Sequence, residues 1–400
     1  MKIYTCKLAT PCTNPVVVDD MILTKQMPTA AGSKMLDGYM SLFDAQVITN
    51  LTQAGFSLVG KTDVGEFSID LLGETSYNGA VTADGKLTHA SAEALKAGEA
   101  LASVNLDVNG SVRRAAAQNG LVSIKPTYGT VSRYGTVPAA CSGETVSVMA
   151  NDAQTCRKVL SAIAGHDDKD GTSLSEEACA HIREGAPFTP VKKVALLTPM
   201  TQGIDGEVSQ KLQDFRKKLA ACGVEVCPVD SKEIPLARVA WNILMSAELC
   251  NNVSRYDGVK YGYRAEHFSN IDELYTNSRT EAFGDLLKTA ILFGSETLST
   301  ENYMKVYDKA LRTRRVICQA FKALFEEFDA VLMPACSTMA YSCEQVAAQA
   351  DLPFTENFYT APASITGLPA LVTQGVQLVG KAFSENALFA LAEAVEKEVK

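Results

Sequence analysis

Hydrophobic and polar positions follow two different periods along this chain, and together they predict a protein that mixes helices with strands. Residues 44–54 carry apolar side chains at helical spacing up to Gly55, and the apolar run at 56–59 is typical of a buried strand. The same alternation returns as a strand, a helix and a strand at 191–199, 207–221 and 224–229. This rhythm favours a mixed or parallel sheet covered by helices.

One further helix is predicted from Tyr303 to Phe328, where apolar side chains recur at spacings of three and four. Arg314 stands on this apolar stripe. Because an unpaired charge is costly at a core-facing position, its guanidinium must have a partner. Two interpretations are open. Arg314 either reaches out at the edge of the core or bonds a structural carboxylate, or its planar fork holds the carboxylate of a ligand.

Composition narrows the class of protein. Of the 400 residues, 46% are apolar and 21% charged, which allows a sizeable core. The net charge of −9 argues against direct nucleic-acid binding. We expect no secretory signal, because the first residues show no basic stretch followed by an apolar run. We expect no membrane span, because no run of eighteen apolar residues is present. Eleven scattered cysteines and four histidines predict reduced thiols in a cytoplasmic protein without a metal site.

Two familiar motifs are present only in outline. Residues 55–62 match the phosphate-loop expression G-x-x-x-x-G-K-[ST], but that loop needs a strand before its first glycine and a helix after its lysine. Here a helix precedes Gly55 and a strand lies inside the motif, so we expect no nucleotide site. Residues 166–177 resemble a calcium loop, yet they offer no oxygen ligand at the first position and have Leu174 at the ninth. We interpret them as a solvated acidic loop.

A more specific signal is the stretch at 103–138, which reads SVNLDVNGSVRRAAAQNGLVSIKPTYGTVSRYGTVP. It resembles the amidase signature family, whose nucleophile lies in a stretch close to D-T-G-G-S-I-R followed by G-L-K-P-T-Y-G-x-V-S-R-Y-G. Within that family the likeness is greatest to the A subunits of tRNA-dependent amidotransferases. It continues in AGSKML, VGKTDVGEF, SRYDGVKYGYR and YTAPASITGLPALV at 31–36, 59–67, 254–264 and 359–372.

The resemblance implies an α/β fold of the amidase-signature type, with a mixed central sheet covered by helices and a shortened N-terminus. It implies a single domain over 1–400, with a divergent segment at 1–14 and a surface loop excursion at 164–190. No cofactor is expected. The expected partners are glutamine or a related small amide and, as subunits, proteins like the amidotransferase B and C subunits. We expect no direct nucleic-acid contact and no membrane contact.

The family's chemistry uses a lysine base, a relay serine on a cis peptide and a second serine as nucleophile. Carried over to this chain, the nucleophile is Ser111, and the amides of Val108, Asn109 and Gly110 line the oxyanion hole. Asn109 replaces a glycine of the family. Because a residue with a side chain adopts a positive φ only at some cost, we expect the hole to be distorted.

The other two triad positions carry different residues. Asp19 stands at the lysine position, with a shorter side chain of opposite charge, and Leu87 stands at the relay position. We expect a trans peptide at Leu87, and a buried Asp19 near Ser111 with a raised pKa. Thr88 or His89 as a substitute relay is the open alternative.

The resemblance also implies a pocket for glutamine. Arg314 matches the arginine that holds the substrate α-carboxylate, and Tyr263 matches a tyrosine of the pocket. Asn357 stands where an acidic residue grips the α-amino group, and an amide holds an ammonium more weakly.

Two functions follow from this set of residues. Because triad members act as a unit, the first is a catalytically impaired paralogue that serves as a binding or assembly component. The alternative is a working glutaminase, amidase or amidotransferase subunit that uses Ser111 with a rearranged base.

Overall fold

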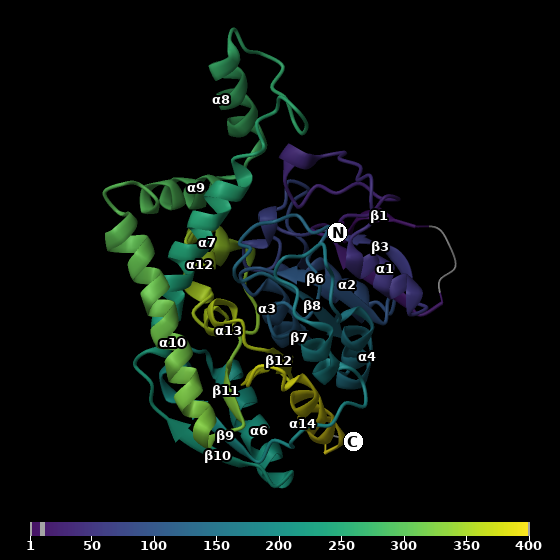
Figure 1. The fold of residues 1–400 in the computed structure, drawn as a ribbon, viewed down its shortest axis with the longest axis vertical. Coiled ribbons are helices and arrows are strands. Elements are labelled where there is room, and N and C mark those ends of the chain that lie inside the picture. The colour runs from purple at the N-terminus through teal and green to yellow at the C-terminus, as the bar shows by residue number, and fades with distance from the viewer. Residues whose placement is uncertain (1, 9–12, 399–400) are drawn as a thin grey trace.

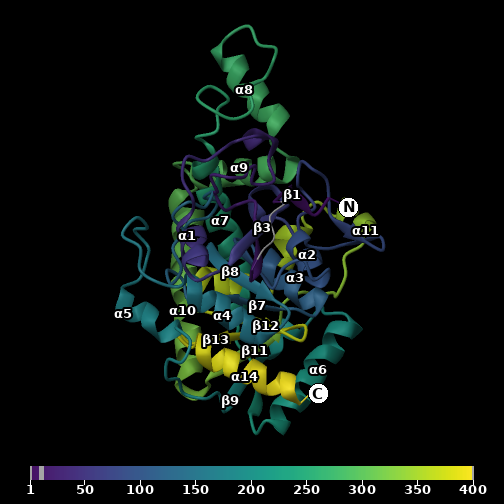
Figure 2. The same cartoon turned by 90° about the vertical axis from the view of Figure 1, so that its right-hand side faces the viewer.

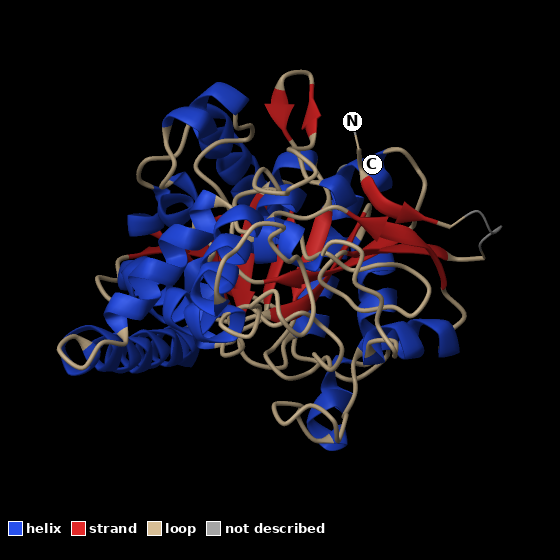
Figure 3. Cartoon of the chain, turned by 90° about the horizontal axis from the view of Figure 1, so that it is seen from above, coloured by secondary structure: helices blue, strands red, loops and turns tan. Residues whose placement is uncertain are grey.

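A mixed sheet of eleven strands runs through the computed structural model, which describes residues 2–8 and 13–398. The strand order is β1-β3-β2-β6-β8-β7-β12-β13-β11-β9-β10, and β4 and β5 form a separate ribbon. Seen from above, helices lie on both faces of the sheet (Figure 3). Residues 1 and 9–12 of the segment expected to diverge lie outside the described residues.

The strands are β1 (Tyr4–Lys7), β2 (Pro15–Asp19), β3 (Ser57–Thr62), β4 (Thr82–Ala83), β5 (Lys86–Leu87), β6 (Ala102–Asp107), β7 (Val122–Lys125), β8 (Thr145–Ala150), β9 (Lys193–Leu197), β10 (Glu225–Val229), β11 (Ala330–Pro334), β12 (Ala370–Thr373) and β13 (Val376–Gly380). The α-helices are α1 (Gln46–Gln53), α2 (Ala90–Lys96), α3 (Ser111–Asn119), α4 (Ala153–Ile163), α5 (Glu176–Cys179), α6 (Gly206–Ala221), α7 (Ala237–Val253), α8 (Ile271–Ala282), α9 (Asp285–Thr297), α10 (Asp308–Glu327), α11 (Cys343–Ala348), α12 (Leu352–Glu356), α13 (Ala361–Thr366) and α14 (Glu385–Lys397). Short helical turns are η1 (Lys34–Leu36), η2 (Glu66–Ser68), η3 (Ala180–Ile182), η4 (Thr198–Thr201), η5 (Ile234–Leu236) and the π-helical turn η6 (Tyr303–Tyr307).

The elements predicted from the hydrophobic pattern all form. The helix expected at 44–54 is α1, and the strand expected at 56–59 belongs to β3. The strand, helix and strand further on are β9, α6 and β10, with β9 and β10 paired in parallel. The long helix expected from Tyr303 begins as η6 and continues as α10. Lys61 of the phosphate-loop expression lies inside β3 and is buried, so the loop that a phosphate would need is not there.

Alternate residues of the central strands contribute to two separate apolar cores. Val16 and Val18 of β2 belong to the larger core, and Val17 belongs to the smaller one. Leu87 and Val112 also pack in the smaller core, which lies under α2 and α3. Because side chains alternate along a strand, Asp19 points to the same face of the sheet as Val17.

Two helical parts lie away from the sheet. Figures 1 and 2 both show α8 projecting from the body, and Figure 1 shows α10 along one edge of the molecule. Residues 164–190, the expected surface excursion, contain α5 and η3. Within the described part, no helix is long and apolar enough to cross a membrane.

Candidate active site

Ser111 is the first residue of α3, directly after a tight turn at the end of β6. The turn depends on Gly110, whose φ is +90°. A Cβ at this position would lie 2.4 Å from the side chain of Thr360, so only glycine fits. Since the first amides of a helix have no partner within it, free N–H groups converge around Ser111. Such a group of donors is what an oxyanion hole requires.

We expected Asn109 to adopt a positive φ and distort the oxyanion hole, and this prediction of a positive φ is wrong. Among the described residues Gly110, and not Asn109, carries the positive φ, so the asparagine adopts an ordinary backbone conformation. Its side chain is used instead. The Asn109 Nδ2 donates to the carbonyl of Ile69 at 2.8 Å, and its Oδ1 accepts from the Nδ2 of Asn357 at 2.8 Å. Asn109 therefore ties the turn before Ser111 to two distant segments.

Two buried arginines follow Ser111 and hold the surrounding loops. Arg113 forms a two-pronged ion pair with Asp107, with its Nε 2.8 Å from Oδ2 and its Nη2 3.0 Å from Oδ1. Burial alone would raise the pKa of Asp107, but Arg113 outweighs it and holds that pKa below its usual value. Arg114 donates to the carbonyls of Asp70 and Asn109, each at 3.0 Å. Residue pattern alone did not single out this pair, although two adjacent arginines before a run of three alanines were the available signal.

Asp19 lies at the end of β2 and is only 1% exposed. Its Oδ2 accepts from the Leu106 amide at 2.7 Å, and its Oδ1 accepts from the Met21 amide at 3.1 Å. Burial raises its pKa to about 7, which confirms the predicted burial and the direction of the shift. Because β2 and β6 are parallel neighbours, Asp19 and Ser111 lie at the same edge of the sheet. Both carboxylate oxygens are nevertheless engaged with backbone donors, and within the described ranges no hydrogen bond joins Asp19 to Ser111.

At the relay position, Leu87 is 6% exposed and packs in the smaller core. All peptide bonds of the described residues are trans, as expected for Leu87. The neighbouring Thr88 hydroxyl donates to Glu93 at 2.7 Å and is directed away from Ser111, toward the far end of α3. Neither residue offers a hydroxyl to the nucleophile.

His89 does not supply a base either. Its Nδ1 accepts the Ser91 amide at 3.2 Å and so caps α2. Burial lowers its pKa to about 4, so the ring is neutral near pH 7. With Nδ1 acting as acceptor, the proton of the neutral ring belongs on Nε2, which is then a donor. The His89 ring can donate a hydrogen bond but has no free nitrogen to take a proton.

Lys61 is a buried lysine in the neighbouring strand. Its Nζ donates to Thr29 and lies 3.7 Å from the Asp20 carboxylate, and burial lowers its pKa to about 8. In the sheet Lys61 lies opposite Val18, so its side chain shares the face of the larger core. Asp19 points to the other face. Lys61 is thus separated by the sheet from the position where the base is missing.

Asn357 and Tyr263, two of the residues expected to bind substrate, have different surroundings in the structure. Asn357 is fully buried, and its Nδ2 donates to Asn109 and to Asn242 at 2.8 and 2.6 Å. Its Oδ1 has no partner in the described part of the chain. Tyr263 lies elsewhere: its hydroxyl donates to Glu281, and its ring lies under the Lys34 Nζ at 4.0 Å.

Arg314 is half-buried on α10. Its Nη2 donates to the carbonyl of Ser142 at 3.4 Å, a long hydrogen bond, and Ser142 is itself held by Glu248. Within residues 2–8 and 13–398 no carboxylate pairs with Arg314. The structural carboxylate of the first interpretation is therefore absent there, and most of the guanidinium donors remain available.

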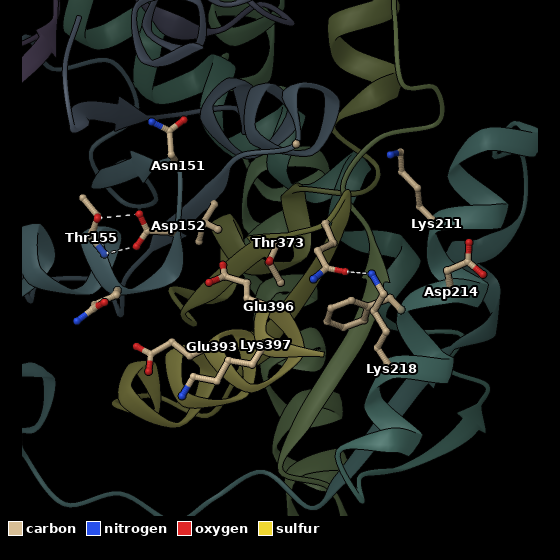
Figure 4. A pocket seen from close by; sticks show the side chains of 15 residues that line it. Asn151, Asp152, Thr155, Lys211, Asp214, Lys218, Thr373, Glu393, Glu396 and Lys397 are labelled. Atoms are coloured by element: carbon tan, nitrogen blue, oxygen red, sulfur yellow. Dashed lines mark hydrogen bonds between the residues drawn. The ribbon is translucent and has the colours of Figure 1, made fainter. Parts of the chain in front are cut away.

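The site is closed over in this structure. The residues at the nucleophile, base, relay and oxyanion positions are all buried, and so is Asn357. A cleft of about 1010 Å³ lies at the other end of α3, beyond Gly120, between α4, α6 and α14. Figure 4 shows Asp152 on one side of this cleft and Lys211 and Lys218 on the other. Ser111 is not among its lining residues.

A buried strand, a glycine turn and a serine at a helix N-terminus, set in a mixed sheet, define the class of protein. The chain belongs to the Amidase family, whose model matches residues 13–389. It is similar to the A subunit of the Glutamyl-tRNA(Gln) amidotransferase of Coxiella burnetii, with 33% identity over 401 residues that cover 96% of this chain and 83% of that protein. The corresponding protein of Lachnoclostridium phytofermentans is 34% identical over 410 residues, with the same coverage.

Solved structures confirm the expected fold. The crystal structure of the Glutamyl-tRNA(Gln) amidotransferase A subunit from Thermotoga maritima matches with a TM-score of 0.80 and 26% identity, over 99% of this chain and 87% of that one. The K. lactis urea amidolyase shares the fold with a TM-score of 0.79 and 24% identity, over 95% of this chain and 22% of that much longer one. The predicted family and fold class are both confirmed.

Proposed function

We propose that this chain is a catalytically impaired relative of the amidotransferase A subunits and serves as a binding or assembly component. The observation that carries the proposal is the state of the two missing triad positions. Asp19 is engaged with the amides of Leu106 and Met21, and Leu87 is part of an apolar core. The turn at Ser111 is preserved without the groups that would activate it.

The loss of triad members determines how far the rate of amide hydrolysis should fall. A serine hydroxyl attacks an amide only when a neighbouring base removes its proton. In enzymes whose triad acts as a unit, loss of one member lowers the rate by roughly 10⁴-fold or more. Two of the three members are replaced here. Of the two nearby candidates for a substitute base, His89 can only donate a hydrogen bond, and Lys61 lies on the opposite face of the sheet from Asp19. We therefore expect hydrolysis to be negligible.

Ligand binding has better support than catalysis. Arg314 has spare donors that suit a carboxylate, and the unpartnered Oδ1 of Asn357 suits an ammonium once the closed site opens to admit it. We propose glutamine or a related small amide as the ligand, and proteins like the amidotransferase B and C subunits as partners. The similarity to subunits of Glutamyl-tRNA(Gln) amidotransferases supports this assignment. We also propose a cytoplasmic location, supported by the ten described cysteines, all of which are free.

One observation favours the alternative, a working amidase with a rearranged base. Asp19 has a pKa near 7, the range in which a general base works best, and it lies at the same edge of the sheet as Ser111. Under this alternative, a movement that frees its carboxylate would let it accept the serine proton.

Hydrolysis by the full chain distinguishes the two functions. Ammonia release from glutamine and from simple amides is measured for the wild-type chain, with Ser111→Ala as the blank. We expect equal rates. Ammonia release that is lost in Ser111→Ala and also in Asp19→Asn would overturn the proposal and establish the alternative.

A further inference from the structure

The one tryptophan of the chain, Trp241, lies on α7 and is only 1% exposed. Its ring is part of the larger apolar core. The indole Nε1, however, has no hydrogen-bond partner among residues 2–8 and 13–398. A buried tryptophan N–H normally has such a partner, because leaving a donor without one costs free energy. Packing alone therefore does not account for Trp241, since a phenylalanine would fill a core without that cost.

The ring of Trp241 takes the place of a missing side chain at Gly143. A Cβ on Gly143 would lie 2.2 Å from Cη2 and 2.4 Å from Cζ3 of the indole. The carbonyl oxygen of Ser364, on α13, is 3.2 Å from the same point. The indole thus fills the space beside the turn at 142–143 and next to α13, and it fits there only because residue 143 is a glycine.

Both proposed ligand-binding residues are connected to this space. Ser142, which precedes the glycine of the turn, accepts the long hydrogen bond from Arg314 at 3.4 Å. Asn242, the residue after Trp241, accepts from the Nδ2 of Asn357 at 2.6 Å. Figure 1 shows α7 close to α12 and α13, and residues of α7 contact both of those helices. The indole therefore lies among the groups that we propose hold the ligand.

The helix α13 also connects the indole with the nucleophile turn. Thr360, at the start of α13, packs against Gly110 of that turn. Ser364 follows one helical turn later, on the order of 6 Å along the axis, and its Oγ accepts from Arg113 at 2.7 Å. Trp241 is thus close to both ends of a site in which an amide held by Arg314 and Asn357 would face Ser111.

We propose that Trp241 occupies the ligand pocket of this site, and that glutamine or a related amide binds only after the indole has turned out of it. The proposal rests on the proposed function, whose ligand it uses. In the outward position the Nε1 donor reaches water, and the Asn357 Oδ1 becomes accessible. The outward form is the minor one, so the apparent affinity for the ligand is reduced by the fraction of molecules in that form.

The alternative is that Trp241 is an ordinary core residue. The two roles differ in the sign of one effect. Removal of a core residue damages the fold and does not tighten the binding of a ligand. Removal of a side chain that occupies the pocket tightens binding, because the ligand no longer has to displace it.

The first measurement is the intrinsic fluorescence of the wild-type chain during a titration with glutamine. Since the chain has one tryptophan, the emission maximum reports the environment of Trp241 alone. We expect emission at short wavelength without ligand, typical of a buried indole. At saturating glutamine we expect a shift to longer wavelength and stronger quenching by acrylamide.

The second measurement is the affinity for glutamine, by calorimetry, of variants of the full chain. Gly143→Ala places a methyl group where the ring now lies, whereas Gly171→Ala, the matched control, meets no atom within 4 Å. Neither glycine has a positive φ, so both backbones accept alanine. We expect Gly143→Ala to bind at least about tenfold more tightly than the control, and to show the long-wavelength emission before ligand is added.

Trp241→Ala should show the same gain in affinity if circular dichroism shows that it folds, and Gly143→Ala decides if it does not. Unchanged emission at saturating glutamine would overturn the proposal. So would a folded Gly143→Ala that binds glutamine no more tightly than Gly171→Ala, or absence of binding from every folded variant. Failure of the proposed function has a different readout, which is ammonia release by the wild-type chain that is lost in Ser111→Ala.

Discussion

Restoring the two missing triad members should restore part of the chemistry. Asp19→Lys returns a base and Leu87→Ser returns a relay hydroxyl, while Ser111 and its turn are already in place. A relay is useless without its base, and a base has no path to Ser111 without the relay. The double variant should therefore recover more hydrolysis than the sum of the two single variants.

The structure sets the cost of this repair. Leu87 is only 6% exposed in an apolar core, so replacement by serine should cost about 3 kcal/mol of folding free energy. Asp19→Lys leaves the amides of Leu106 and Met21 without their acceptors and buries a cation, which should cost on the order of 3–5 kcal/mol. The total free energy of unfolding of a protein domain is about 5–15 kcal/mol. We expect a folded but strongly destabilised double variant, which urea unfolding would measure.

Ammonia release from glutamine is the assay, with Ser111→Ala added to the double variant as the background. We expect at least about a hundredfold gain over either single variant, which is a part of what a complete triad provides. A folded double variant with no hydrolysis above background would refute this reasoning. The site would then have decayed beyond these positions, and Arg314 would have to be reassigned as a structural residue.

Three further predictions concern single residues. Gly110→Ala should lower the free energy of unfolding in urea by about 3 kcal/mol or more, because Gly110 has a positive φ and a Cβ there would meet Thr360. Gly120→Ala should cost only about 1 kcal/mol, because Gly120 also has a positive φ but has open space around it. Equal costs for the two variants would contradict a tight turn at Gly110. Folding raises the pKa of Asp19 from 3.8 to about 7, so its contribution to stability is complete below pH 4 and is lost as the pH rises to 7. Asp19→Asn should therefore flatten the pH dependence by up to about 4 kcal/mol, and parallel curves would count against a buried, protonated Asp19. Arg314→Ala should change stability by less than about 1 kcal/mol but abolish the rise in melting temperature that glutamine produces, whereas a large loss of stability would make Arg314 structural.

Local parts of the fold and site could be predicted from the sequence. The helix and strand at 44–59 and the strand, helix and strand between 191 and 229 each follow from side-chain period and a nearby turn residue, and the turn before Ser111 follows from its Asn-Gly pair. The burial of Asp19, by contrast, was predicted only from the family resemblance, and its Leu106 donor lies 87 residues away in the chain.

Contacts across the chain could not be predicted in the same way. The Asn109 side chain bonds Asn357, which is 248 residues away, and Arg113 bonds the Thr360 carbonyl, which is 247 residues away. Hydrophobic pattern shows that a polar side chain is buried but does not name its partner. The prediction for Arg314 was limited for a related reason. Spacing placed it on the apolar stripe, whereas the packing leaves it half-buried beside Ser142.

The central claim is that nothing in this chain activates Ser111. The most direct measurement is the intact mass of the full chain after incubation with an alkyl fluorophosphonate, which forms a covalent adduct with an activated serine. The repaired double variant serves as the positive control, and Ser111→Ala serves as the negative one. We predict no adduct at Ser111 in the wild-type chain and an adduct in the repaired variant. Stoichiometric labelling of wild-type Ser111 would contradict the claim and show that a base is present.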